Sequence, residues 1–186
     1  MKKLLVLLMV VALAAAVTGV AGCGGNTSQA QTATKAADAA YKVVNADLDN
    51  LQTMLTPILG GALSGNFSAL TPAALSSATA LVNKILAEMP AVKAQYQKVA
   101  AMSGVPDYTA YANAMIKAID ANTKAITMLK GLMAALTPLV AAGNAAGITA
   151  YFTTNSAVIN ELQTLSTQAS DAYNQAQSIK TSKNLK

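Results

Sequence analysis

The sequence predicts an all-α protein, an up-down-up-down antiparallel four-helix bundle with long helices. In four long segments the apolar residues recur at alternating steps of three and four. This spacing keeps them on one face of a helix and favours a left-handed supercoil of the coiled-coil type. Ala, Leu, Lys, Gln and Met, all good helix formers, dominate the 186 residues, and only 4% are aromatic. Short breaks containing Gly or Pro separate the segments, so consecutive helices should run in opposite directions.

The helices are expected near residues 33–59, 72–102, 106–142 and 147–180, within a bundle domain spanning 33–182. At 1.5 Å per residue each would be about 40–55 Å long. The expected core positions of the first two helices are Tyr41, Val44, Leu48, Leu51, Leu55 and Ile58, then Leu75, Ala78, Val82, Ile85, Met89, Val92, Tyr96 and Val99. Those of the last two are Tyr108, Ala112, Met115, Ile119, Asn122, Ile126, Leu129, Met133, Leu136 and Val140, then Tyr151, Asn155, Val158, Leu162, Leu165, Ala169, Ala172, Ala176 and Ile179.

The residues at the segment ends agree with these boundaries. Thr71 is a good N-cap, and Pro72 follows it at the first helical position, where a missing N–H costs nothing. Gly104 ends the second helix and Pro106 begins the third, while Gly143 marks the end of the third.

The first 22 residues have the layout of a secretory signal peptide. Lys2 and Lys3 form a short positive region, and residues 4–17 are an uninterrupted apolar run. Small residues follow. Such a segment is too short and wrongly flanked for a membrane-spanning helix, so we expect its removal.

The end of this leader, Val20-Ala21-Gly22-Cys23, resembles the lipobox of bacterial lipoproteins. The resemblance covers residues 1–25 and implies cleavage after Gly22. It also implies a diacylglyceryl thioether on Cys23, usually with an added N-acyl chain such as palmitate. Cys23 is the chain's only cysteine and stands at the required place. The alternative is an ordinary signal peptide in which Cys23 falls there by chance.

The lipobox resemblance implies an exported protein anchored in a membrane, because two or more acyl chains hold a protein there stably. A residue other than Asp after Cys23, here Gly24, resembles the default for transfer to the outer membrane in a diderm host. The protein would then face the periplasm or the cell surface, and otherwise the outer face of the cell membrane. Residues 23–32, small and polar after Cys23, are expected to be a flexible linker between the lipid and the bundle.

Composition excludes several kinds of chemistry. There is no His, so catalytic triads and Glu-x-x-His metal sites cannot form, and the carboxylates are single charges among lysines at helical spacing, such as Lys84 and Glu88 or Asp120 and Lys124. We therefore expect no enzyme, no catalytic residue, no metal and no cofactor. Every basic residue is Lys, and because guanidinium is favoured for contacts with bases and phosphates, a nucleic-acid partner is not expected.

Two long stretches carry no charge, one between Asp49 and Lys84 and one between Lys130 and Glu161. In the expected topology their bends meet at the end opposite Cys23. The larger apolar side chains there, our candidate contact tip, are Leu59, Leu63, Phe67, Leu70, Val140, Ile148, Tyr151 and Phe152. Exposed contiguous apolar surface commonly marks a contact site, but the same residues could instead close the end of the bundle.

The favoured interpretation is a non-enzymatic, lipid-anchored envelope lipoprotein with a structural or interaction role. Its expected partners are the membrane and an envelope protein or polymer at the contact tip. A second interpretation is a carrier or sensor that holds a small apolar ligand among the small residues of the seam. A third is a membrane-inserting helical protein, in which the uncharged segment 131–152 enters a bilayer as a hairpin.

Overall fold

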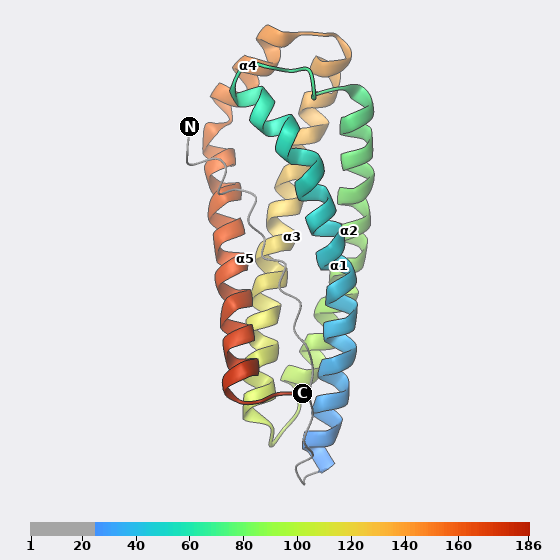
Figure 1. The fold of residues 1–186 in the computed structure, drawn as a ribbon, viewed down its shortest axis with the longest axis vertical. Coiled ribbons are helices and arrows are strands. Elements are labelled where there is room, and N and C mark those ends of the chain that lie inside the picture. The colour runs from blue at the N-terminus through green and yellow to red at the C-terminus, as the bar shows by residue number, and fades with distance from the viewer. Residues whose placement is uncertain (1–24) are drawn as a thin grey trace.

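The computed structural model describes residues 25–186, and every regular element in that range is an α-helix. The helices are α1 (Gly25–Leu63), α2 (Pro72–Ala100), α3 (Pro106–Ala141), α4 (Ala145–Thr154) and α5 (Ser156–Ser182). They pack as an elongated bundle (Figure 1). The predicted all-α class is therefore confirmed, and the number of helices differs from the expected four.

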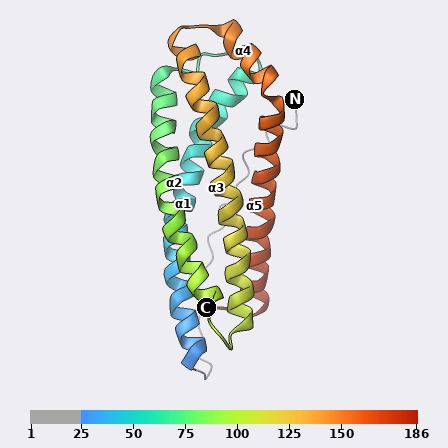
Figure 2. The same ribbon diagram turned by 180° about the vertical axis from the view of Figure 1, so that it is seen from behind.

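α3 is the central helix of the bundle. It packs against α2 and α5 along most of its length and also contacts α1 and α4, and from behind it is seen to run between α2 and α5 (Figure 2). α1 packs mainly on α2. Over the whole length of these two described helices, no Cα atom of α1 lies within 8 Å of a Cα atom of α5. Side chains must therefore span the distance between α1 and α5.

The bundle has two ends of different composition. The first turn of α1, the loop 101–105 and residues 183–186 lie together at one end, which we call the base (Figure 1). The loops 64–71 and 142–144 lie with α4 at the opposite end, which we call the far end (Figure 1). The two uncharged bends therefore share the far end.

The predicted core positions of the first three helices are buried. All eight positions predicted for α2 are buried, as are the six of α1 and the ten of α3. α3 buries a second face as well, through Tyr111, Ala114, Ala118, Ala121 and Leu132, because it has neighbours on several sides. Burying one large aliphatic side chain contributes about 1.5–3 kcal/mol, so these apolar faces hold the helices together.

The predicted start of α2 is confirmed in detail. The Thr71 side chain accepts a hydrogen bond of 3.1 Å from the backbone N–H of Ala74, and Pro72 is the first helical residue. The loop between α2 and α3 contains Gly104 with φ +77°, a conformation that is readily available only to glycine. The base therefore forms a tight turn between two long helices.

The expected flexible linker is wrong for residues 25–32, which form the first turns of α1. Ala30 and Thr34 are fully buried, and the Asn26 side-chain amide donates a hydrogen bond of 3.1 Å to the carbonyl of Ser103. Ala30, Thr34 and Ala37 continue the core spacing below Tyr41 with small side chains. Residues 23 and 24 of the expected linker lie outside the described residues.

The expected fourth helix, 147–180, is interrupted. α4 ends at Thr154, where the backbone N–H and the side-chain amide of Asn155 both donate to the Tyr151 carbonyl, at 3.0 and 2.9 Å. α5 then begins at Ser156. The break turns α4 across the far end, where Ile148 and Phe152 are buried (Figure 1).

The last turn of α1 provides a matched pair of glycine tests. A Cβ at Gly61 would lie 2.4 Å from the carbonyl oxygen of Asn66, whereas a Cβ at the exposed Gly60 would meet nothing within 4 Å. We expect Gly61→Ala to lower the free energy of unfolding by about 1–3 kcal/mol. Gly60→Ala should raise it by up to about 1 kcal/mol, because Ala loses less backbone entropy in a helix. Chemical denaturation of both variants checks this, and equal effects would contradict it.

Candidate functional site

Asp38 is the centre of a polar network inside the bundle. Its Oδ1 atom accepts hydrogen bonds from the Oη atoms of Tyr96, at 2.7 Å, and Tyr111, at 2.6 Å. Its Oδ2 atom accepts one from Lys180 Nζ at 2.5 Å, which is also an ion pair. Because these residues come from α1, α2, α3 and α5, one carboxylate joins the four long helices.

Aromatic rings fill the space around this carboxylate. The rings of Tyr96 and Tyr111 meet edge to face, with centroids 6.1 Å apart, and Lys180 Nζ lies 5.6 Å from the centroid of Tyr111. One turn further along α1, Tyr41 stacks on Tyr173 of α5 with centroids 5.8 Å apart. These long side chains bridge α1 and α5, whose backbones do not touch.

The phenols of the network resist ionisation. Burial, reinforced by the nearby Asp38 carboxylate, raises the pKa of Tyr96 and of Tyr111 far above the ordinary value of 10.0. Burial likewise raises the pKa of Tyr41. Each phenol therefore keeps its proton at neutral pH, and those of Tyr96 and Tyr111 donate to Asp38.

This arrangement fits a structural clamp better than a reactive centre. Oδ1 of Asp38 already accepts two hydrogen bonds and Oδ2 accepts one from an ammonium group, so neither oxygen is poised to take a proton from a substrate. A nucleophilic phenolate would need a lowered pKa, which is the opposite of what burial causes here. The geometry of the network therefore supports a structural role, in which Asp38 holds the four long helices together at one level.

We expect alkaline pH to destabilise the bundle through these tyrosines. In the unfolded chain the phenols ionise near pH 10, whereas in the folded protein they do not, so the contribution of these tyrosines to stability is constant below pH 10 and falls above it. The loss should be about 1.4 kcal/mol per pH unit for each of Tyr41, Tyr96 and Tyr111.

Urea denaturation at a series of pH values measures this slope. Tyr96→Phe should reduce the slope by about 1.4 kcal/mol per pH unit, because the unfolded chain then releases one proton fewer. Its lower stability at neutral pH, from the lost hydrogen bond, does not affect that comparison. Tyrosinate absorbance that titrates fully near pH 10 while the helical spectrum is retained would contradict the interpretation.

One of the four network residues was predicted from the sequence pattern and three were not. Tyr96 is one of the predicted core positions, whereas Tyr111 lies on the second buried face of α3, which the pattern did not indicate. Asp38 and Lys180 were not identified from sequence, because each is a single charge beside an apolar position. In antiparallel helices Asp38 and Lys180 lie at the same level, and this was the signal that could have identified them as partners.

The predicted lipidation site falls outside the described residues. This applies to Cys23 and to the cleavage-site residues Val20, Ala21 and Gly22. Cys23 is only two positions before Gly25, where α1 begins, so at most about 7 Å separates their Cα atoms.

The candidate contact tip does not form the exposed apolar surface that was considered. Leu70, Val140, Ile148 and Phe152 are buried in the core, with exposed fractions of 5%, 8%, 3% and 9%. Leu59, Phe67 and Tyr151 are half-buried and pack against the same core, and the side chain of Leu63 lies outside the described residues. The physical reason is the break at Asn155, which lets α4 fold over the end of the bundle.

We expect Phe152→Ala to lower the free energy of unfolding by about 3–5 kcal/mol, because it removes a buried ring from the far end. The neighbouring Thr153→Ala is the matched control. Thr153 is exposed and its hydroxyl bonds only to the Thr149 carbonyl one turn earlier, so its effect should stay within about 0.5 kcal/mol. Thermal or chemical denaturation compares the two, and unchanged stability of Phe152→Ala would restore the idea of a contact tip.

The observed partners of the surface charges differ in part from those expected from spacing within one helix. Lys84 does approach Glu88, at 4.0 Å, but its closer partner is Asp47 of α1, at 2.8 Å. Asp120 pairs with Lys93 of α2, at 2.6 Å, rather than with Lys124. These pairs cross between helices, which spacing within a single helix does not indicate.

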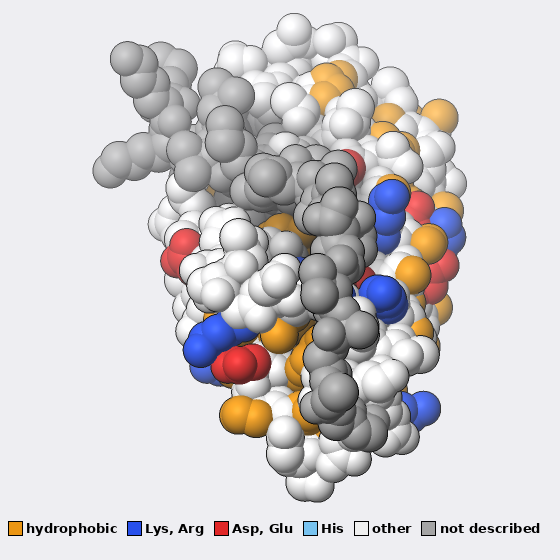
Figure 3. Space-filling view, turned by 60° about the horizontal axis from the view of Figure 1, so that its bottom comes forward, with side chains coloured by type: hydrophobic (Ala, Val, Ile, Leu, Met, Phe, Trp, Pro, Cys, Tyr) orange, Lys and Arg blue, Asp and Glu red, His pale blue; other side chains and the backbone are white. Residues whose placement is uncertain are grey.

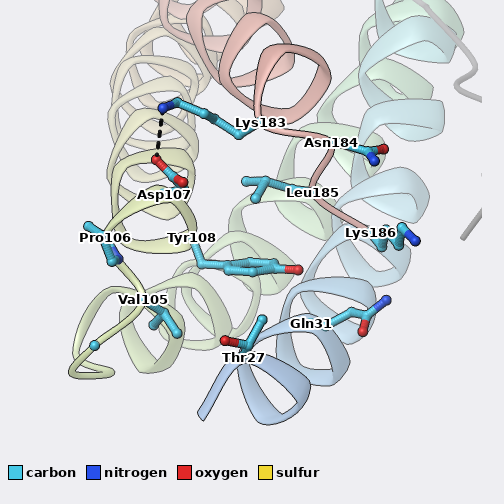
Figure 4. A pocket seen from close by; sticks show the side chains of 11 residues that line it. Thr27, Gln31, Val105, Pro106, Asp107, Tyr108, Lys183, Asn184, Leu185 and Lys186 are labelled. Carbon is cyan, nitrogen blue, oxygen red and sulfur yellow. Dashed lines mark ion pairs between the residues drawn. The ribbon is translucent and has the colours of Figure 1, made fainter. Parts of the chain in front are cut away.

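A pocket of about 330 Å³ lies at the base (Figure 4). α1 contributes Thr27 and Gln31, and the start of α3 contributes Tyr108, whose ring extends across the pocket (Figure 4). Lys183 and Asp107 form an ion pair of 3.4 Å at its edge (Figure 4). The pocket is lined by both polar and apolar groups.

The described residues also bear on the expectations about a metal site and a membrane-inserting segment. Across residues 25–186 no group of three or more His, Cys, Asp or Glu residues is arranged to hold a metal ion. In the same range α3 alone is long and apolar enough, by length and composition, to cross a membrane, with a mean hydropathy of 1.3. A core helix also satisfies that criterion, and α3 packs against each of the other helices.

No protein-family model, curated protein or solved structure matches this chain.

Proposed function

We propose that this chain is a lipid-anchored envelope protein with a non-enzymatic, structural or interaction role. One observation carries the proposal: the chain's single cysteine ends a signal-peptide-like leader, two residues before the first helix of the bundle. Acyl chains on Cys23 would therefore hold the base of the bundle against a membrane. The bundle itself would be an up-down-up-down four-helix bundle in which α4 and α5 together supply the fourth helix.

The structure of α1 supports a rigid connection to the anchor. Residues 25–32 are helical, and Asn26 is hydrogen-bonded to Ser103 in the loop between α2 and α3. Farther along α1, Asp38 holds the other three long helices. With so short a connection to Cys23, the bundle would stand with a restricted orientation on the membrane.

The burial of the far end bears on where a partner could bind. α4 covers that end and its apolar side chains face the core, so an interaction role would fall to the sides of the bundle or to its base. An envelope protein or polymer remains the class of partner that an anchored bundle would meet.

The lipid anchor can be tested directly in a bacterial host that processes lipoproteins. Cells grown with radiolabelled palmitate should yield labelled protein in the membrane fraction. Cys23→Ser should abolish the label and leave the uncleaved precursor, because the thioether cannot form. Ser28→Ala, an exposed position in α1, is the control and should keep the label. Unlabelled wild-type protein released from the cells would refute the anchor.

A further inference from the structure

The charges of the described chain are unevenly distributed along the bundle. The Asp38 network joins α1, α2, α3 and α5 at one level, so the segments on its base side are 25–38, 96–111 and 180–186. These segments contain five lysines and two aspartates, namely Lys35, Lys98, Lys180, Lys183 and Lys186 with Asp38 and Asp107. The rest of the described chain contains six lysines and six acidic residues. The whole net charge of +3 therefore lies at the base.

Several of the base lysines are available to a ligand. Lys35, Lys98 and Lys183 are exposed. Lys98 and Lys183 lie close to the loop 101–105, Lys98 within the last turn of α2 and Lys183 directly after α5. Lys35 lies higher on α1, and because helical side chains tilt toward the N-terminus of their helix, its stem is directed toward the base. Lysine side chains are visible on both sides of this end when it is turned toward the viewer (Figure 3).

The acidic residues at the base cancel only two of its five lysine charges. Asp38 is occupied by Lys180 and two phenols inside the bundle, and Asp107 is paired with Lys183. Lys35 and Lys98 have no acidic partner among the described residues. An excess of ammonium groups therefore remains on the end of the bundle that lies nearest to Cys23.

We propose that the base is a docking surface for the anionic phospholipid headgroups of a bilayer, a proposal that rests on the lipid anchor proposed above. The positive charge of the base and its position next to Cys23 both support this occupant. Lysines close to an anionic leaflet are attracted to it within roughly one Debye length, about 8–10 Å. Acyl chains two residues before α1 would hold Lys98 and Lys183, beside the loop 101–105, close to that distance. Lys35, about 15 Å along α1 from Gly25, would lie at the outer limit of this attraction. The lysines then fix which end of the bundle faces the lipid.

The test uses the mature chain, residues 23–186, with Cys23→Ser, so that no acyl chain contributes to binding. The described core lies within residues 30–176 and is complete in this chain, and circular dichroism checks its fold. Co-sedimentation is measured with phosphatidylcholine vesicles and with vesicles that also contain phosphatidylglycerol. The base variant is Lys35→Gln with Lys98→Gln and Lys183→Gln. The control variant makes the same charge change at the exposed α3 positions Lys117, Lys124 and Lys130.

The proposal expects binding to the anionic vesicles that weakens at high salt and exceeds binding to neutral vesicles. A lysine close to an anionic surface contributes about fivefold in affinity. The loss of three lysines in the base variant should therefore weaken binding by about a hundredfold where all three lie near the lipid, and by at least about fivefold where only one does. The control variant should bind nearly as well as the parent chain. Equal binding to both kinds of vesicle, or equal losses in the two variants, would overturn the proposal.

These outcomes are independent of acylation. Palmitate labelling in cells tests the anchor, whereas the vesicle experiment uses a chain that cannot be acylated. Palmitate labelling without preferential binding to anionic vesicles would support the anchor and refute the docking surface. Preferential vesicle binding without palmitate labelling would support the docking surface and refute the anchor.

Discussion

The carboxylate of Asp38 is the constraint on which the arrangement of the four long helices depends. Its two oxygens accept two hydrogen bonds from phenols and one from an ammonium group, each donated from a different helix. Replacing the carboxylate would leave three donors without their acceptor in a largely buried place, where unmade hydrogen bonds are costly. The apolar positions, by contrast, repeat every three or four residues and are mostly Ala, Leu, Val and Ile. Such repeats would tolerate a slip by one heptad, so a single polar level selects one register.

The same network explains how α1 is held beside α5. These helices have no backbone contact, and small core residues such as Ala169 and Ala176 on α5 cannot reach across. The stacked rings of Tyr41 and Tyr173 and the ion pair of Asp38 with Lys180 can. Elsewhere in the bundle, closely packed helices provide the burial that stabilises the fold. Along this seam, a few long side chains provide the cohesion.

The sequence predicted best what a periodic pattern encodes directly. All eight predicted core positions of α2 are buried because burial of one helix face follows from spacing alone. The start of α1 was placed too late because Ala30, Thr34 and Ala37 continue the buried face with side chains too small to mark it. The break at Asn155 was missed because the apolar spacing continues through it. A local bond from the Asn155 side chain to the Tyr151 carbonyl ends the helix there.

The Asp38 network was missed for a different reason, since its members come from four separate segments. Tyr96 precedes the loop 101–105 by five residues and Tyr111 follows it by six, so an antiparallel turn places them at one level. Asp38 lies inside the expected helix 33–59, but the spacing within α1 does not show which of its residues stands level with Tyr96 and Tyr111. A single charge in a predicted helix gave no other sign that it joins three further helices.

The two ends of the bundle depend on different forces and should respond to different perturbations. At the far end, stability comes from apolar burial under α4, through side chains such as Ile148 and Phe152, and no charged residue takes part. Near the base, it depends on phenols that must stay protonated beside a carboxylate. High pH therefore acts on the base, whereas loss of apolar volume acts on the far end. Because the two regions share no partner, substitutions in them should combine additively, so the base can retain its register when the far end is weakened.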